Sequence, residues 1–217
     1  MAALACALLL MPTADPRAAD ATAAGGLAAD FSAARLHFEE GRAGSRTATD
    51  LAQELFSRLL HADGDNPLYL AYYGSTYALQ GRDSTAPWTR LRLINKGVAM
   101  LDRALALLDQ AVARSNAAAG SAQLETRLVA IATYVALPDI LFHRLDAAQR
   151  QYQLAVGSPA YALAPTGLQG HLQYEGALIA RARHQDAAEK TALQRVLALW
   201  PEHVDLDEVR TRLAALP

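Results

Sequence analysis

The sequence has one cysteine, few aromatic residues and almost no runs of valine, isoleucine or threonine. A single cysteine excludes a framework of intramolecular disulfides. The missing β-branched runs argue against a β-sheet protein, since such residues are typical of strands. Lysine and arginine are not in excess either, because the net charge is -2 with both signs mixed along the chain. The sequence lacks the basic footprint of a nucleic-acid-binding protein, so we expect no nucleic-acid partner.

Alanine, leucine, arginine, glutamine and glutamate are present throughout the chain, and all of them favour helix. Apolar residues make up 52% of the 217 residues, which is enough for a sizeable core. This length suits one compact domain or one short repeat array. The composition therefore predicts an all-α protein.

The N-terminal segment differs from the rest of the chain. An apolar run from Ala2 to Met11 is too short to cross a bilayer as a helix, and small residues at 19–23 fit the cleavage rule of a secretory signal peptide. No lysine or arginine precedes the run, as one would in a signal peptide, so the true start of the protein stays open. The alternative interpretation of this segment is an alanine-rich tail. Because Cys6 lies inside the run, we do not expect a lipoprotein. We predict a signal peptide over 1–21 and a periplasmic or secreted mature chain.

An internal repeat pattern follows. Leu70, Tyr73, Gly74, Tyr77 and Gly81 lie 3, 1, 3 and 4 residues apart, which places them on one stripe of a helix. At this stripe a glycine at 74 lets a neighbouring helix come close, and a glycine at 81 can end the helix. The pattern predicts a helix that packs closely against its neighbour.

A second spacing of small and large residues comes next, at Gly97, Leu101, Ala104, Leu105 and Asp109. Together the two patterns resemble the first and second helices of a tetratricopeptide repeat. In that family proline usually stands at the position of Asp109, and leucine at that of Arg127. The resemblance implies a right-handed superhelix of antiparallel helix pairs, a TPR-like solenoid of about four degenerate repeats plus a capping helix.

The repeat spacing assigns residues 22–217 to a single domain, with a generic helical bundle as the alternative. The predicted pairs and the closing helix, with Asp205 as its N-cap, are 29–62, 67–113, 121–157, 166–200 and 205–215. The insertion at 83–92 is expected to form a loop and an extra helical turn. Pro138 is expected to end the helix that precedes it. The stretch 157–167 is the least helical internal stretch. Residues 81–105 and 126–148 are also similar to a group of bacterial repeat proteins, which indicates a fold rather than a function.

Residue sets for catalysis, metals and phosphates are missing from the sequence. No two histidines lie four residues apart, and neither a nucleophile elbow nor a phosphate-binding glycine loop occurs. The stretch 63–66 lacks the later carboxylate of a calcium loop, so we interpret it as a helix end followed by a cap. We expect no enzyme activity, no metal and no cofactor.

Three aromatic residues near the second pair form a candidate interaction edge. Tyr69 and Tyr72 lie off the packing stripe, and Trp88 lies in the insertion. Exposed aromatic side chains favour interfaces because they combine a large apolar area with a polar group. Arg82 and Asp83 end the same helix. One interpretation is a structural ion pair, in which Asp83 can also pair with Arg90 or Lys96. The alternative is a polar contact with a partner protein.

In the resembled family the first helices line a concave groove. The matching positions here are Ser32, Leu36, Glu39, Leu68, Ala71, Ser75, Glu125, Val129, Gln173 and Ala177. This set is small, apolar and lightly charged, which suits an extended peptide or an amphipathic helix. We predict a non-catalytic scaffold that binds a segment of a protein partner in the cell envelope. The alternatives are a small or lipid-like ligand, a second copy or the chain's own tail in the groove, or an envelope hydrolase.

Overall fold

The computed structural model describes residues 16–114, 120–200 and 206–217. Within these ranges all regular secondary structure is helical, which confirms the all-α prediction. The helices are α1 (Pro16–Arg42), α2 (Arg46–Ala62), α3 (Pro67–Asp83), α4 (Pro87–Arg114), α5 (Ser121–Ala136), α6 (Asp139–Phe142), α7 (Leu145–Val156), α8 (Pro159–Leu163), α9 (Thr166–Ala182), α10 (Asp186–Leu199) and α11 (Leu206–Ala215).

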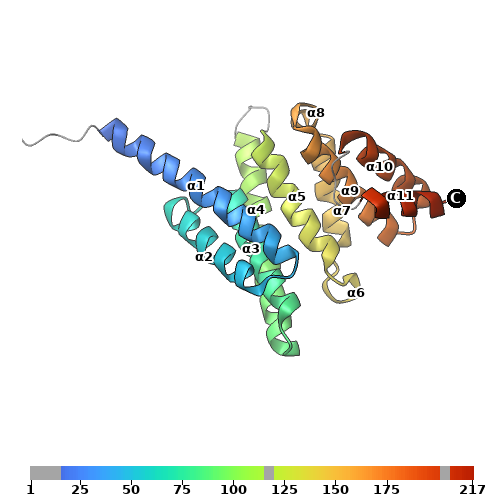
Figure 1. The fold of residues 1–217 in the computed structure, drawn as a ribbon, viewed down its shortest axis with the longest axis horizontal. Coiled ribbons are helices and arrows are strands. Elements are labelled where there is room, and N and C mark those ends of the chain that lie inside the picture. The colour runs from blue at the N-terminus through green and yellow to red at the C-terminus, as the bar shows by residue number, and fades with distance from the viewer. Residues whose placement is uncertain (1–15, 115–119, 201–205) are drawn as a thin grey trace, which may run out of the picture.

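The long helices pack in consecutive pairs, α1 on α2, α3 on α4, α5 on α7 and α9 on α10 (Figure 1). Neighbouring pairs meet through α2 and α3, through α3 and α5, and through α5 and α9. These pairs agree with the ranges predicted from the repeat spacing, apart from the start of the first one. The closing helix α11 packs on α10, while its predicted N-cap, Asp205, lies outside the described residues.

The first helix begins much earlier than residue 29. The alanine-rich stretch before that residue favours helix strongly enough to continue it through the glycine pair at 25 and 26. A Cβ atom added at either glycine would meet nothing within 4 Å, and α1 projects from the body at its N-terminal end (Figure 1). The predicted signal peptide falls mostly outside the described residues, and its last part, from Pro16, belongs to α1.

The connection between the first two pairs confirms the cap interpretation of 63–66. The Asn66 side chain accepts hydrogen bonds from the backbone amides of Leu68 at 3.1 Å and Tyr69 at 3.2 Å, and Pro67 begins the helix. Asparagine as N-cap and proline in the first turn are a favourable helix start. The expectation that Gly81 ends α3 is wrong, because the helix continues to Asp83.

Glycines bring α3 and α4 into backbone contact, as the packing stripe predicts. A Cβ atom added at Gly74 would lie 2.9 Å from the carbonyl oxygen of Gly97, and one added at Gly97 would lie 2.5 Å from that of Gly74. Gly81 faces the same helix, where a Cβ would meet the Ile94 side chain at 2.6 Å. A residue larger than glycine would clash with the facing helix at these positions unless the two helices moved apart.

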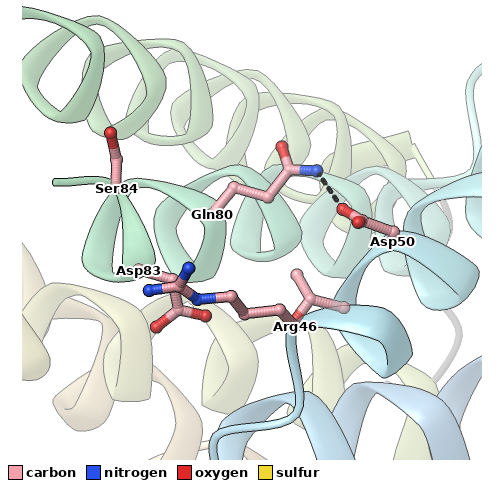
Figure 2. A pocket seen from close by; sticks show the side chains of 6 residues that line it. Arg46, Asp50, Gln80, Asp83 and Ser84 are labelled. Carbon is pink, nitrogen blue, oxygen red and sulfur yellow. Dashed lines mark hydrogen bonds between the residues drawn. The ribbon is translucent and has the colours of Figure 1, made fainter. Parts of the chain in front are cut away.

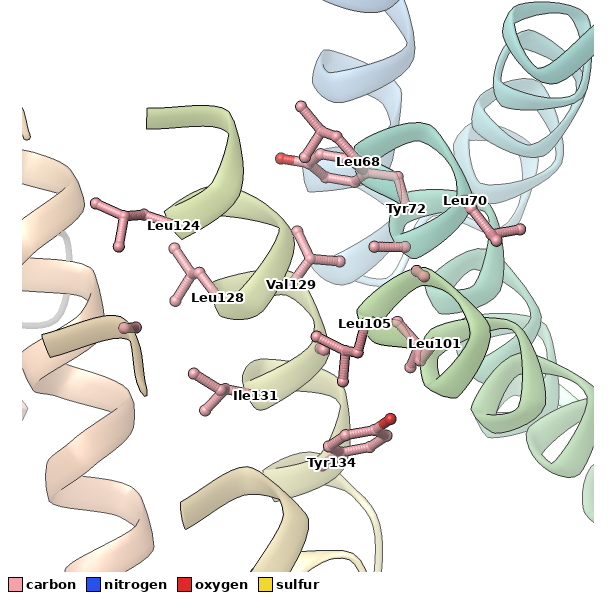
Figure 3. Packing of buried hydrophobic residues seen from close by; sticks show 14 of the residues in the cluster. Leu68, Leu70, Tyr72, Leu101, Leu105, Leu124, Leu128, Val129, Ile131 and Tyr134 are labelled. Carbon is pink, nitrogen blue, oxygen red and sulfur yellow. The ribbon is translucent and has the colours of Figure 1, made fainter. Parts of the chain in front are cut away.

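Helix α5 lies in the middle of the core and packs on both sides (Figure 3). Leu124, Leu128 and Ile131 point toward the C-terminal helices, whereas Val129 and Tyr134 point toward α3 and α4. All five side chains are buried. This two-sided burial joins α1 to α9 into one core, beside which a smaller cluster forms between α9, α10 and α11.

Two polar bridges also tie α5 to α4. The hydroxyl group of Tyr134 donates to Asp102 at 2.7 Å, and the buried guanidinium of Arg127 donates to Asp109 at 2.6 Å. Arg127 and Asp109 are the residues that depart from the tetratricopeptide pattern, and here they pair with each other.

The irregular segments are partly helical. The 83–92 insertion forms the predicted loop and extra helical turn, since residues 84–86 connect α3 to α4 and α4 begins at Pro87. Proline is favourable in a first helical turn, so Pro87 starts the helix here. The stretch 157–167 contains the short helix α8. The prediction at Leu137-Pro138 is confirmed, since α5 ends at Ala136 and α6 follows.

Candidate functional site

A groove of about 1240 Å³ runs across the first helix of each pair. Its walls are the C-terminal parts of α1 and α3, the N-terminal end of α4, helices α5 and α6, and the start of α9 together with Trp200. The glycine contact between α3 and α4 and the central place of α5 fix these walls relative to one another. The groove is therefore built on packed helices rather than on loops.

A polar triad lies in the floor of the groove. The Tyr72 hydroxyl donates to the Glu125 carboxylate at 2.5 Å, and Arg35 pairs with the same carboxylate oxygen at 3.1 Å. Burial, and then the neighbouring Glu125 carboxylate, raises the pKa of Tyr72 well above its ordinary value. Tyr72 is therefore a permanent hydrogen-bond donor, and the triad joins α1, α3 and α5.

A second polar contact joins α3 to α5 beside it. The hydroxyl oxygens of Ser75 and Thr133 lie 2.7 Å apart, and Thr133 donates to the Val129 carbonyl at 2.8 Å. Because Thr133 has only one hydroxyl proton, Ser75 is the donor in their contact. The contact between the two hydroxyls therefore ties α3 to α5.

Arginine side chains line one end of the groove. Arg42 pairs with Glu39 at 3.0 Å. Arg82 donates to the carbonyls of Gly41 at 2.8 Å and Arg42 at 3.0 Å, and these carbonyls lie in the last turn of α1. Positive charge at a helix C-terminus is favourable, so Arg82 fixes the end of α1 in the groove wall.

Asp83 takes part in this arrangement only through Arg82. Its carboxylate accepts a hydrogen bond from the neighbouring guanidinium at 2.7 Å, which lowers its pKa below the ordinary value. The predicted partners Arg90 and Lys96 are wrong, because Arg90 donates to the Ser84 carbonyl and Lys96 to the Tyr77 hydroxyl. Arg82 and Asp83 thus form a structural ion pair, and their contact with a partner stays a prediction.

Large apolar side chains stand exposed at the mouth of the groove. Trp88 and Leu91 come from the added part of α4 and are 84% and 41% exposed. Leu141, on the short helix α6, is 68% exposed. Both helices arise where the repeat pattern is interrupted. The irregular segments thus give the groove an apolar rim.

A smaller pocket of about 170 Å³ lies between α2 and α3 (Figure 2). Gln80 donates to Asp50 at 2.9 Å inside it, and Arg46 and Asp83 lie beside this pair. Its volume is below the range of roughly 300–1,000 Å³ that is typical of ligand sites.

Six of the ten predicted site residues line the groove, namely Glu39, Tyr72, Ser75, Arg82, Trp88 and Glu125. The expectation of an exposed Tyr72 is wrong, since only 4% of the residue is exposed and its ring packs among Phe31, Phe38 and Phe56. Tyr69 is half-buried beside Phe31 and does not reach the groove.

Leu36, Asp83 and Gln173 also lie away from the groove. Leu36 is exposed on another face of α1. Asp83 faces the smaller pocket, as described above. Gln173 is buried, where its amide donates to Tyr161 at 2.7 Å and accepts from Tyr152 at 3.2 Å. The family positions therefore identify the right helices but not always the right face.

The sequence-based prediction included Arg82 and Trp88 but missed the other three arginines of the groove and the rim residues Leu91 and Leu141. On α1 the groove face is Arg35, Phe38, Glu39 and Arg42, a spacing of 3, 1 and 3 that matches one helical stripe. This spacing is visible in the sequence, one residue out of phase with the family positions. For Leu91 and Leu141 no comparable signal exists, because their helices follow interruptions of the repeat, and Trp200 lies just beyond the last residue of α10.

A buried carboxyl group lies behind the groove. Glu175 on α9 is buried, burial raises its pKa to about 7, and its Oε2 atom has no hydrogen-bond partner among the described residues. His171 lines the groove one turn earlier, with Nε2 at 3.7 Å from the carboxylate. Glu175 does not line the groove itself, so it is not placed to protonate a bound substrate.

Within the described ranges, no cluster of three or more histidine, cysteine, aspartate or glutamate side chains could hold a metal ion. None of the helices described is both long and apolar enough to span a membrane.

Comparison of the chain with protein-family models, curated proteins and solved structures finds no match. The groove itself is therefore the main observation that bears on function.

Proposed function

We propose that the protein is a non-catalytic interaction scaffold that binds a segment of a protein partner in its groove. The observation that carries the proposal is the exposed apolar rim, Trp88, Leu91 and Leu141, above a preformed groove. Exposed tryptophan and leucine at the edge of a concave surface are typical of recognition sites, where a few buried anchors supply most of the affinity. A helical or extended segment can place apolar side chains against such a rim.

The proposal includes a right-handed superhelix of the tetratricopeptide type. The consecutive helix pairs and the groove along their first helices support it. We also propose that the protein is exported to the cell envelope, where a membrane-associated assembly supplies the partner. The apolar run of 2–11 and the small residues at 19–23 support the export.

Site-specific photocrosslinking in cells tests this function. A photoreactive residue is placed in the full-length protein at Leu141, which lines the groove, and in a second variant at Ile140, its exposed neighbour that does not. We expect the Leu141 variant to form one dominant protein adduct that the Ile140 variant lacks. Equal adducts at both positions would contradict groove binding. Mass spectrometry of the same sample gives the N-terminus, and an uncleaved chain in the cytoplasm would contradict export.

A small or lipid-like ligand is the second candidate, favoured by the partly apolar lining of the groove. It predicts an organic molecule that co-purifies with the protein and no dominant crosslinked protein. Native mass spectrometry of the gently purified chain, before and after organic extraction, distinguishes the two functions.

A further inference from the structure

We infer that the groove selects a partner segment in which a bulky apolar side chain lies next to a carboxylate. This inference rests on the proposed function and specifies the chemistry of the partner. It depends on two features of the first turns of α4. One is a pair of exposed apolar side chains, and the other is an arginine that forms no ion pair with a carboxylate of a described residue.

The apolar feature is the pair Trp88 and Leu91, three residues apart on one face of α4. Leu141 stands at the mouth of the same groove on α6. All three side chains remain largely or partly in water, so a side chain that covers them gains the burial of their apolar area. The rim is therefore formed from two helices that line the same groove.

The charged feature is Arg90, which lies between these two apolar residues in the chain. Four arginines line the groove, and three of them pair with carboxylates: Arg35 with Glu125, Arg42 with Glu39, and Arg82 with Asp83. Arg90 donates instead to the Ser84 carbonyl, at 3.2 and 2.7 Å, and forms no ion pair with a described residue.

The charge of Arg90 is therefore not balanced at the groove. A neutral carbonyl leaves a full positive charge on the guanidinium, and both carboxylates that line the groove are already paired. A carboxylate on the partner would complement it, with the fork geometry that arginine offers to carboxylates. A lysine or arginine at that place would be repelled, which makes the charge a selective feature.

A peptide segment fits these features better than a small anion does. The volume of about 1240 Å³ exceeds the range of roughly 300–1,000 Å³ that is typical of small-molecule pockets. The site also needs its apolar anchor and its carboxylate within a few residues, a spacing that a peptide supplies easily.

Selection from a library of short random peptides displayed on phage tests the inference on the full chain. We expect the selected peptides to carry tryptophan, phenylalanine or leucine within a few positions of aspartate or glutamate. Binding of a selected synthetic peptide can be followed directly, since both tryptophans of the chain, Trp88 and Trp200, line the groove and their emission reports its occupancy.

Matched variants locate the binding. Trp88→Ala and Leu141→Ala should each weaken binding roughly thirtyfold, as the loss of an anchor does, while Ile140→Ala on the same short helix should not. Arg90→Gln keeps a hydrogen-bond donor but removes the charge, and should weaken binding roughly threefold to tenfold. Arg92→Gln, which changes an exposed arginine outside the groove, is its control. These side chains are exposed or partly exposed, and circular dichroism verifies that each variant folds.

A double-mutant cycle decides between the inference and the broader function. Replacing the glutamate of the peptide by glutamine should weaken binding to the natural chain but not to Arg90→Gln. If binding depends on Trp88 and Leu141 but the carboxylate has no effect, the inference is wrong and the scaffold function stands. If the peptides bind Trp88→Ala as well as the natural chain, or if none binds, the scaffold function fails as well. Oleate that changes the tryptophan emission in that case would indicate the small-ligand function.

Discussion

Helices α1 to α4 and helices α9 to α11 are packed by different means. In the first region aromatic rings form a continuous cluster, in which Phe56 stacks on Tyr72 with ring centres 4.9 Å apart. Phe38 meets the same tyrosine edge-on at 5.0 Å, and Phe31 at 6.0 Å. Aromatic contacts of this kind add to the burial of a large apolar area.

The C-terminal region has a small core of alanine and aliphatic side chains and contains buried charge. Glu189 is buried and accepts two hydrogen bonds from Arg212 of α11, at 2.6 and 2.8 Å. Glu175 is also buried, with His171 at 3.7 Å from one carboxylate oxygen and no hydrogen-bond partner among the described residues for the other. The comparison indicates that apolar packing determines the stability of one region, whereas charge and protonation contribute to that of the other.

The largest effect on stability is expected from a substitution that disrupts the aromatic cluster. Phe56→Ala removes a fully buried ring that contacts both Phe31 and Tyr72, and should lower the free energy of unfolding by about 3–5 kcal/mol. Urea denaturation followed by circular dichroism measures the change. Leu154→Ala, at a half-exposed leucine on α7, is the control and should shift the free energy by less than about 0.5 kcal/mol. A loss for Phe56→Ala as small as that of the control would refute the comparison.

The next effect concerns protonation in the C-terminal region. The folded-state pKa of Glu175, about 7, lies above its ordinary value of 4.5, so the fold binds this proton more tightly than the unfolded chain does. The resulting stabilisation is complete below pH 4.5 and is lost as the pH rises through 7, a difference of about 3 kcal/mol.

Glu175→Gln isolates this contribution, because glutamine imitates the neutral carboxyl group. We expect the variant to be more stable than the natural chain above neutral pH and to lack this fall between pH 4.5 and 7. The difference between the two chains is the quantity to measure, since Asp83, whose pKa is lowered by Arg82, destabilises both chains at acid pH. Parallel curves for the two chains over this pH range would show that Glu175 is not the group responsible.

A third prediction compares glycines in the two halves of the chain. Gly97→Ala places a methyl group 2.5 Å from a backbone oxygen of α3, which can move only with its helix, so we expect a loss of about 1–3 kcal/mol. In Gly176→Ala the added methyl group meets the end of the Tyr152 side chain, which can rotate, and alanine is the better helix former. Thermal unfolding of both variants should therefore show the larger change for Gly97→Ala, and the reverse order would be inconsistent with the backbone contact between α3 and α4.

The contrast between regular and irregular segments also explains how much the sequence could predict. Helix pairs were predictable because a stripe such as Leu70, Gly74 and Gly81 depends only on helical spacing within one element. The burial of Tyr72 was not, because it depends on Phe38 and Phe56 from two other helices. Contacts between elements far apart in the chain leave no periodic signal in either one.

The same limit applies to the groove. Glu39, Ser75 and Glu125 were predictable from family positions on the first helices, whereas the rim residues Leu91 and Leu141 follow interruptions of the repeat. The pairing of Arg127 with Asp109 shows the limit in another form. In the sequence, each of these residues is a separate exception to the repeat pattern. Only the fold shows that the two side chains pair with each other.

The smallest predicted effect separates ring packing from hydrogen bonding in the aromatic cluster. Tyr72→Phe keeps the stacked ring and removes only the hydroxyl that donates to Glu125, which retains its contact with Arg35. We expect a loss of about 1 kcal/mol in urea denaturation, the usual contribution of one hydrogen bond. Tyr69→Phe, at a half-buried tyrosine of the same helix whose hydroxyl bonds to no other described residue, is the matched control. A loss for Tyr72→Phe comparable to that of Phe56→Ala would mean that the polar triad, not the rings, determines the stability of this region, and the two regions of the molecule would then depend on charge alike.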